Sequence, residues 1–200
     1  ECEVRANNRI ERFLKASHLP EGKTFENFKM SRLPPKIAQQ VQTLRIGAFV
    51  DHRENILAFG KPGSGKTHLL CALGHELVRQ GRAVFFAPAC LLVQEMLLAK
   101  RDLRLPKFLR KLAKFEALII DDLGYVQQNR EEMEVLFTLL AERYERGTVM
   151  LTCNLVFSKW DQIFKDPMTT AAAIDRVVHH SIILELNMDS YRVDEAKKNK

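Results

Sequence analysis

The 200-residue sequence predicts an α/β protein built as a three-layer sandwich, with helices on both faces of a five-stranded parallel sheet. The first observation behind this prediction is a set of short, almost continuously apolar runs, as expected of strands that are buried on both faces. The second is that segments with apolar residues at helical spacing separate these runs, which favours right-handed parallel crossovers. The predicted strands are 56–59, 83–87, 117–120, 148–152 and 181–186.

Helices are expected before, between and after these strands. Residues 5–17 and 36–50 carry apolar side chains at helical spacing and flank a loop that contains proline and glycine, so residues 1–50 are interpreted as an N-terminal helical and linker segment. Residues 51–192 form the predicted main domain, and residues 193–200 a disordered tail. The further predicted helices are 66–80, 89–101, 106–114, 130–146, 158–164 and 167–179.

Composition excludes several classes of protein. With 46% hydrophobic residues the chain is able to bury one substantial core, and no uncharged apolar run approaches the roughly 20 residues of a membrane span. The four cysteines have neither disulfide-dense nor zinc-site spacing, which favours a reducing, cytoplasmic location without a membrane partner. The charged opening stretch lacks the apolar centre of a secretory signal and fits an internal start.

A glycine-rich turn marks the first candidate site. The segment "GKPGSGKT" (60–67) fits G-x-x-x-x-G-K-[ST] and lies between the first predicted strand and a helix, where backbone N–H groups and the helix N-terminus attract phosphate. Lys66 is expected to reach the β- and γ-phosphates of ATP and to act in catalysis, and Thr67 to bind Mg²⁺. The alternative is an ordinary glycine-rich turn. The predicted nucleotide-binding residues are Gly60, Lys61, Pro62, Gly63, Ser64, Gly65, Lys66, Thr67 and His68.

Two adjacent carboxylates follow the third predicted strand, in "ALIIDDLG". They would repel each other unless a cation or a reaction uses them. Beside a phosphate-binding loop, Asp121 is predicted to hold Mg²⁺ and Asp122 to orient or deprotonate the attacking water. The next strand ends in Thr152 and Asn154, which a parallel sheet directs at the γ-phosphate or its water, so Asn154 is a candidate sensor. The alternatives are a capping acid beside a solvated one, and an asparagine that only starts a loop.

Arg176 is a further candidate catalytic residue in the predicted helix 167–179. Its side chain is long enough to reach either an acid of the same chain or the nucleotide of a neighbouring subunit. A solvated or salt-bridged helix arginine is the alternative. His179 and His180 end the same helix, where a favourable dipole contact explains them, and no metal site is assigned to them.

The net charge of +6 is concentrated in one place. Residues 100–114 carry seven Lys or Arg against one Asp, with leucine and phenylalanine interleaved on the other side of the predicted helix. Such a segment is able to present cations to DNA phosphates, and its lack of an aromatic stacking pattern favours backbone contact over base reading. A solvated helix face is the alternative. The candidate DNA-binding residues are Lys100, Arg101, Arg104, Lys107, Arg110, Lys111 and Lys114.

The sequence also resembles a known family over about residues 9 to 192. The segments "ENILAFGKPGSGKTHLLCALG", "ALIIDDLGY", "LTCNLVFSKW", "DPMTTAAAIDRVVHHSIILELNMDSYR" and "RIERFLKASHLPEGKTFENF" look like the IstB family, the ATP-binding helper proteins of bacterial insertion sequences. The P-loop and the acid pair are generic to many NTPases, whereas "SKW", "DRVVHH" and "SYR" in combination are specific.

This resemblance implies an AAA+ ATPase related to the helicase loader DnaC and the initiator DnaA. Such proteins form homo-oligomers with ATP between subunits, bind and bend double-stranded DNA, and recruit and stimulate a cognate transposase. Arg176 then matches an arginine finger acting in trans, Asn154 the sensor, and Arg192 a second basic contact at the nucleotide or the interface. No separate C-terminal lid is expected, and the location implied is the bacterial cytoplasm.

Three functions compete at this point. The first is an ATP-dependent, DNA-binding transposition helper, with slow, Mg²⁺-dependent ATP hydrolysis as a timer for its assembly. The alternative is a DnaC-like helicase loader that binds single-stranded DNA and a replicative helicase, against which the "SYR" ending and the "DRVVHH" helix argue. A small-molecule kinase would need an acceptor pocket and a lid, for which the sequence gives no support.

Overall fold

A computed structural model describes residues 2–125, 130–160 and 167–191 of the chain. Its sheet has the predicted five parallel strands, in the order β2-β3-β4-β1-β5. Each strand lies within one or two residues of its predicted position. The strands are β1 (Asn55–Phe59), β2 (Val84–Pro88), β3 (Ala117–Asp121), β4 (Thr148–Cys153) and β5 (Ser181–Glu185).

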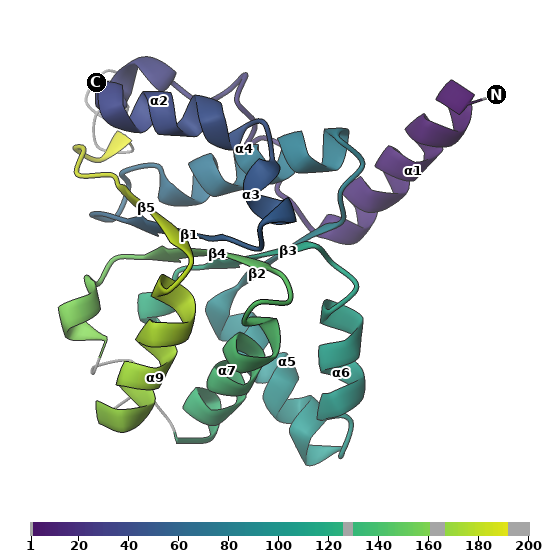
Figure 1. The fold of residues 1–200 in the computed structure, drawn as a ribbon, viewed down its shortest axis with the longest axis vertical. Helices are drawn as coiled ribbons and strands as arrows, with labels where there is room; N and C mark the ends of the chain where they lie inside the picture. Colours follow the sequence, from purple (N-terminus) through teal and green to yellow (C-terminus); the bar gives the residue numbers. More distant parts are fainter. Residues whose placement is uncertain (1, 126–129, 161–166, 192–200) are drawn as a thin grey trace, which may run out of the picture.

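Helices cover both faces of this sheet, as predicted (Figure 1). The layer that contains α4 includes the N-terminal helices α2 and α3, and the other layer holds α5, α6, α7 and α9. Three short 3₁₀ segments are η1 (Met30–Arg32), η2 (Leu123–Tyr125) and η3 (Phe157–Lys159). The α-helices are α1 (Cys2–Ser17), α2 (Pro35–Leu44), α3 (Ala48–Asp51), α4 (Lys66–Arg79), α5 (Ala89–Arg101), α6 (Leu105–Leu112), α7 (Arg130–Arg143) and α9 (Pro167–Val178).

Two predicted helices differ from the structure. The expected helix 36–50 is interrupted, because Gly47 has a positive φ of 84°, which no helical residue has. A Cβ at this position would lie 2.6 Å from Gln80 Oε1, so glycine fits the close approach as well. Of the predicted helix 158–164, only the 3₁₀ turn η3 and Trp160 fall within the described residues. The predicted tail 193–200 also lies outside them.

The sheet separates two hydrophobic cores, because successive strand side chains point to opposite faces. In β1, Leu57 and Phe59 pack with α5, α6, α7 and α9, whereas Ile56 and Ala58 pack with α2, α3 and α4. Val41 of α2 is fully buried in this second core, so the N-terminal helices share a core with the sheet. The domain boundary at residue 50 stays a prediction. Among the described residues, no helix is long and apolar enough to span a bilayer.

Candidate nucleotide-binding site

The loop between β1 and α4 is built on glycines with positive φ. Gly60, Gly63 and Gly65 have φ angles of 150°, 80° and 94°. A Cβ on Gly60 would lie 2.2 Å from the carbonyl oxygen of Leu186, and one on Gly63 would lie 2.1 Å from Ser190 Oγ. The loop therefore requires glycine both for its backbone conformation and for the close approach of the chain that follows β5.

Lys66 begins α4 and is only 5% exposed. Its Nζ donates hydrogen bonds to the carbonyl oxygens of Gly60 (2.8 Å) and Lys61 (3.0 Å). The ammonium group is thus held over the loop, at the N-terminus of a 14-residue helix whose first backbone N–H groups also favour an anion. Ser64 Oγ is buried beside it without a hydrogen-bond partner among the described residues.

Thr152 of β4 connects the two acids at the end of β3. Its Oγ1 donates to Asp121 Oδ1 (2.6 Å) and accepts a hydrogen bond from the backbone N–H of Asp122 (2.7 Å). The expectation that Thr152 points at the γ-phosphate is wrong, because this hydroxyl is fully buried against the acids. Asp121 is 8% exposed, and Asp122 has a left-handed φ of 58°, a conformation that a short polar side chain tolerates.

Asn154 follows β4 and lies at the same edge of the sheet. Its Oδ1 is buried and has no hydrogen-bond partner among the described residues. A Cβ on Gly124 would lie 2.0 Å from this oxygen, so only glycine fits there. An unsatisfied buried amide oxygen costs about 1–3 kcal/mol, which a bound water or ligand would recover.

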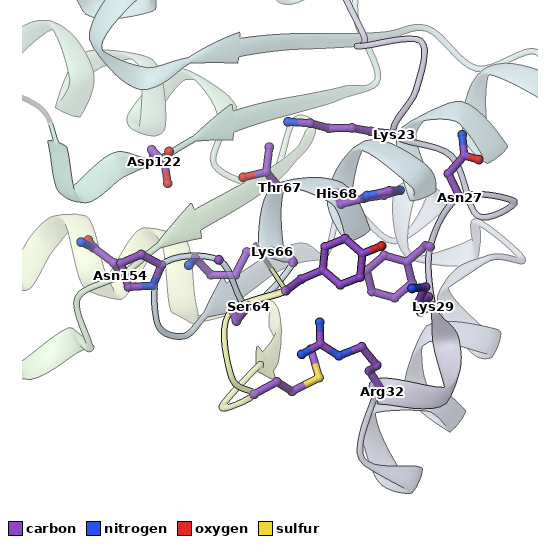
Figure 2. Close-up of a pocket in the computed structure, with 16 residues that line it drawn as sticks. Lys23, Asn27, Lys29, Arg32, Ser64, Lys66, Thr67, His68, Asp122 and Asn154 are labelled. Carbon is purple, nitrogen blue, oxygen red and sulfur yellow. The ribbon is translucent and has the colours of Figure 1, made fainter. Parts of the chain in front are cut away.

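A pocket of about 330 Å³ joins these elements to the N-terminal segment. Figure 2 shows Asp122 and Asn154 on one side of the pocket, Asn27, Lys29 and Arg32 on the other, and Lys66 between them. Of the residues predicted for the nucleotide and its Mg²⁺, Gly60, Lys61 and Asp121 do not line the pocket, whereas Pro62, Gly63, Ser64, Gly65, Lys66, Thr67, His68, Asp122 and Asn154 do. The lining residues that the sequence prediction missed are Lys23, Asn27, Phe28, Lys29, Arg32, Met188 and Tyr191.

Most of the missed residues belong to one segment, residues 20–33, which we call the strap. His68 Nε2 contacts the carbonyl oxygen of Thr24 (2.9 Å), and the His68 ring packs edge-on against Phe28. Glu26 joins the strap to α4: hydrogen bonds from Thr24, from its own backbone and from Arg79 lower the pKa of its carboxyl group to about 2. His68 therefore positions the strap as well as lining the pocket.

The far side of the pocket is closed by Tyr191. Its backbone N–H donates to Gly63 O (3.0 Å), and the cationic groups of Lys29 and Arg32 lie 4.9 and 5.2 Å from its ring centroid. Arg32 also donates to Asp189 O (3.0 Å). The strap has no periodic pattern that would mark it as part of a site. Only the family resemblance pointed to this side of the pocket, through the segments "RIERFLKASHLPEGKTFENF" and "SYR".

The charges of the pocket suit a polyanion with a divalent cation. Four cationic side chains line it, and Asp122 is the one carboxylate among the lining residues described. The residues fit a magnesium nucleotide, since loop amides and Lys66 attract phosphate while Thr67, Asp121 and Asp122 offer the oxygen ligands that Mg²⁺ prefers. The four cations are Lys23, Lys29, Arg32 and Lys66.

Arg176 does not line this pocket. Its guanidinium lies over the Phe137 ring of α7, 4.7 Å from the centroid, and donates to Ala172 O one turn back on α9 (3.0 Å). The side chain is half-buried on the helix layer away from α4. Arg192 lies outside the described residues, so its predicted contact stays a prediction.

The predicted DNA-binding residues gather on the α5–α6 hairpin, at the foot of Figure 1. As predicted, α6 is amphipathic: Leu112 is buried and Phe108 packs on the core, while the basic side chains are exposed. Lys100 pairs with Glu134, and Arg104 with Asp102. The remaining five have no ion pair within the described part of the chain; they are Arg101, Lys107, Arg110, Lys111 and Lys114.

Comparison with solved structures confirms the fold. DnaA from Aquifex aeolicus, bound to AMPPCP, superposes with a TM-score of 0.70 at 21% identity, over 92% of this chain and 56% of that one. The helicase loader DnaC gives 0.59 at 17% identity, over 87% and 98%. The sheet and its helices are therefore arranged as in DnaA and DnaC.

Comparison of sequences gives the family. An insertion sequence ATP-binding protein of Sinorhizobium fredii is 44% identical over 201 aligned residues, which span this whole chain and 67% of that protein. The IS21 ATP-binding protein of Pseudomonas aeruginosa is 39% identical, over 94% of this chain and 71% of its own length. The model of the IstB-like ATP binding protein family matches residues 1–199. The chain belongs to the IstB-like family of insertion sequence ATP-binding proteins.

Proposed function

We propose that this protein is an ATP-dependent transposition helper, which binds and slowly hydrolyses Mg²⁺-ATP, assembles on duplex DNA with ATP between subunits, and acts with its transposase. The pocket formed by the loop, Asp122 and the strap carries this proposal, because four cations meet oxygen ligands there. The relatives are named as ATP-binding proteins of insertion sequences, which supports the link to transposition.

Each residue at the sheet edge has a role in this proposal. The loop amides and Lys66 bind the β- and γ-phosphates, so the Lys66 ammonium exchanges carbonyl oxygens of its own loop for phosphate. Thr67 and Asp121 hold Mg²⁺, which neutralises charge on the phosphoryl group that is transferred. Asp122 and Asn154, which both line the pocket, orient the attacking water.

The base and ribose fit the strap side of the pocket. Phe28, Met188 and Tyr191 offer apolar contact there, and Asn27 offers an amide for hydrogen bonding. Because the strap and the chain after β5 both line this space, a nucleotide bound here would contact both segments. Arg192, the next residue after Tyr191, is proposed to contact the phosphates or the neighbouring subunit.

Arg176 is proposed to act on the nucleotide of a neighbouring subunit. Within one chain its guanidinium packs on Phe137, away from the pocket. A finger supplied in trans couples hydrolysis to assembly, because the phosphoryl charge is stabilised only when two subunits meet.

The α5–α6 hairpin is proposed to bind DNA through phosphate contacts. Its exposed cations would make binding strongly dependent on salt, with each phosphate contact lowering the slope of log K against log salt by about 0.9. A helicase loader that grips single strands is the second candidate. Competition between duplex and single-stranded DNA for the ATP-bound protein separates the two, since the first proposal expects duplex to win.

The decisive test compares duplex binding and ATP binding for wild type, Lys66→Ala and Lys61→Ala. Lys66 is buried and Lys61 is an exposed lysine of the same loop, so the pair is matched in residue type and position. Losing the buried cation is expected to weaken ATP binding by about 2–5 kcal/mol and to abolish ATP-dependent assembly on duplex. Lys61→Ala leaves the loop amides and the buried cation in place, so it is expected to weaken ATP binding less than Lys66→Ala does.

Two outcomes would reject the proposal. If wild type binds duplex DNA equally with and without ATP, the nucleotide does not control DNA binding, and the basic hairpin binds DNA without it. If Lys66→Ala binds ATP as tightly as wild type does, the pocket is not the nucleotide site.

A further inference from the structure

We infer that Leu103, at the tip of the α5–α6 hairpin, is a wedge that inserts between base pairs of duplex DNA. The inference rests on the proposed DNA-binding function and adds a mode of contact to it. The hairpin cations would grip the phosphates, and Leu103 would enter the base stack between them.

The backbone at the tip is a helix C-terminal motif that most often has glycine in its left-handed position. Leu103 N–H donates to Lys100 O (3.0 Å) and Arg104 N–H donates to Ala99 O (2.7 Å), which is the pair of hydrogen bonds of a Schellman motif. The residue in the left-handed conformation is a leucine, with a φ of 57°. An L-residue with a side chain costs stability at this position, so the leucine needs another explanation.

Packing does not supply that explanation. Leu103 is 91% exposed, the highest value among the large exposed hydrophobic residues described, and it belongs to neither hydrophobic core. Leu105, two residues on, packs against the core as an ordinary helix residue does. A strained and almost fully exposed leucine makes no core contact within the described part of its chain, and its strain, more than its exposure, points to a partner that covers it.

The charges around Leu103 identify that partner as a polyanion. Arg104 follows it directly and pairs with Asp102, which precedes it; Arg101 lies two residues before it and Lys107 one turn into α6, all of them exposed. A single apolar side chain between cations is the arrangement of proteins that insert leucine at a base step and hold the flanking phosphates. A lipid surface is less well matched, because membrane-binding helices bury a broad apolar face.

Duplex DNA fits the hairpin better than a single strand. Proteins that bind single strands stack bases on exposed aromatic rings. Both aromatic residues of this segment, Phe108 and Phe115, are instead half-buried and packed on the core. The exposed apolar group is aliphatic, which suits a wedge between stacked pairs.

The test uses 2-aminopurine, whose fluorescence rises when its stacking is lost. A set of duplexes carries one 2-aminopurine each, next to flexible TA or CA steps, and is bound by the full chain with ATP. Leu103→Gly removes the wedge and keeps the left-handed turn. Leu98→Ala is the matched control, since Leu98 is an exposed leucine (56%) of the same hairpin, on α5.

Wild type and Leu98→Ala are expected to raise the fluorescence, and Leu103→Gly to lose that rise while its binding keeps the same dependence on salt. A rise of equal size with Leu103→Gly would overturn the wedge, as would duplex binding by wild type without any rise; in both cases the proposed DNA binding stands. Failure of wild type to bind duplex would overturn both proposals. If Leu103→Gly instead loses binding to phosphatidylserine vesicles and keeps the duplex signal, the leucine contacts lipid.

Discussion

The loop at the carboxyl edge of the sheet and the tip of the α5–α6 hairpin both contain backbone with positive φ, but they use different residues for it. At the loop, glycine occupies these positions, and at Gly60 neighbouring backbone lies within 2.2 Å of where a Cβ would stand. At the tip the residue is Leu103, which is almost fully exposed. The loop is therefore specified by what packs around it, whereas the tip carries a side chain that the fold does not need.

Gly60→Ala gives the largest expected effect and tests the first half of this comparison. The new Cβ would clash with the Leu186 carbonyl oxygen. Leu186 is held there because its N–H donates to Phe59 O, so relieving the clash requires β1 and the chain after β5 to move apart. We expect a loss of about 3 kcal/mol in the free energy of unfolding, measured by urea denaturation.

Gly81→Ala is the control for backbone strain alone. Gly81 has a positive φ of 78° and no atom within 4 Å of its hypothetical Cβ. The expected loss is about 1 kcal/mol. Equal losses for Gly60→Ala and Gly81→Ala would mean that close packing does not specify the loop.

Thr152→Val gives the next largest effect, at the acid end of the same site. Removing the hydroxyl takes away the hydrogen bond to the buried Asp121 Oδ1 and the one from the Asp122 N–H, which is expected to cost about 2 kcal/mol of stability. If the proposed roles of these acids hold, ATP hydrolysis should slow while ATP affinity changes little, because the loop is untouched. Denaturation and steady-state hydrolysis measure the two effects.

The same substitution at Thr148 provides a matched control. Thr148 begins β4, is fully buried, and its Oγ1 has no hydrogen-bond partner among the described residues. Thr148→Val should therefore be neutral or slightly stabilising. A loss as large as that of Thr152→Val would show that the acids gain nothing specific from Thr152.

The two regions also differ in how far the sequence predicts them. The strands, the loop and the acid pair follow from local patterns, since apolar runs and a fixed spacing of glycine and lysine report directly on buried strands and phosphate binding. The strap was missed because its contacts are long-range: Thr24 meets His68, and Arg32 meets Asp189. The predicted orientation of Thr152 was wrong because its hydrogen-bond partners come from another part of the chain: Asp121 ends β3, and Asp122 follows it.

Leu103→Gly has the smallest expected effect and tests the claim that the fold does not need the side chain at the hairpin tip. Leu103→Gly places in the left-handed position the residue that favours it, and it removes no core contact. We expect the protein to become more stable by about 0.5–1 kcal/mol, since relief of the strained backbone outweighs the added freedom of the unfolded chain. Thermal and urea denaturation of the DNA-free protein measure this gain.

Leu98→Gly makes the same chemical change inside α5, where φ is helical, and should cost about 1 kcal/mol. If Leu103→Gly raises the free energy of unfolding while Leu98→Gly lowers it, Leu103 lowers the stability of the folded chain, as a residue retained for an external partner would. A loss at both positions would mean that Leu103 stabilises the hairpin, and the leucine would then need no partner to account for it.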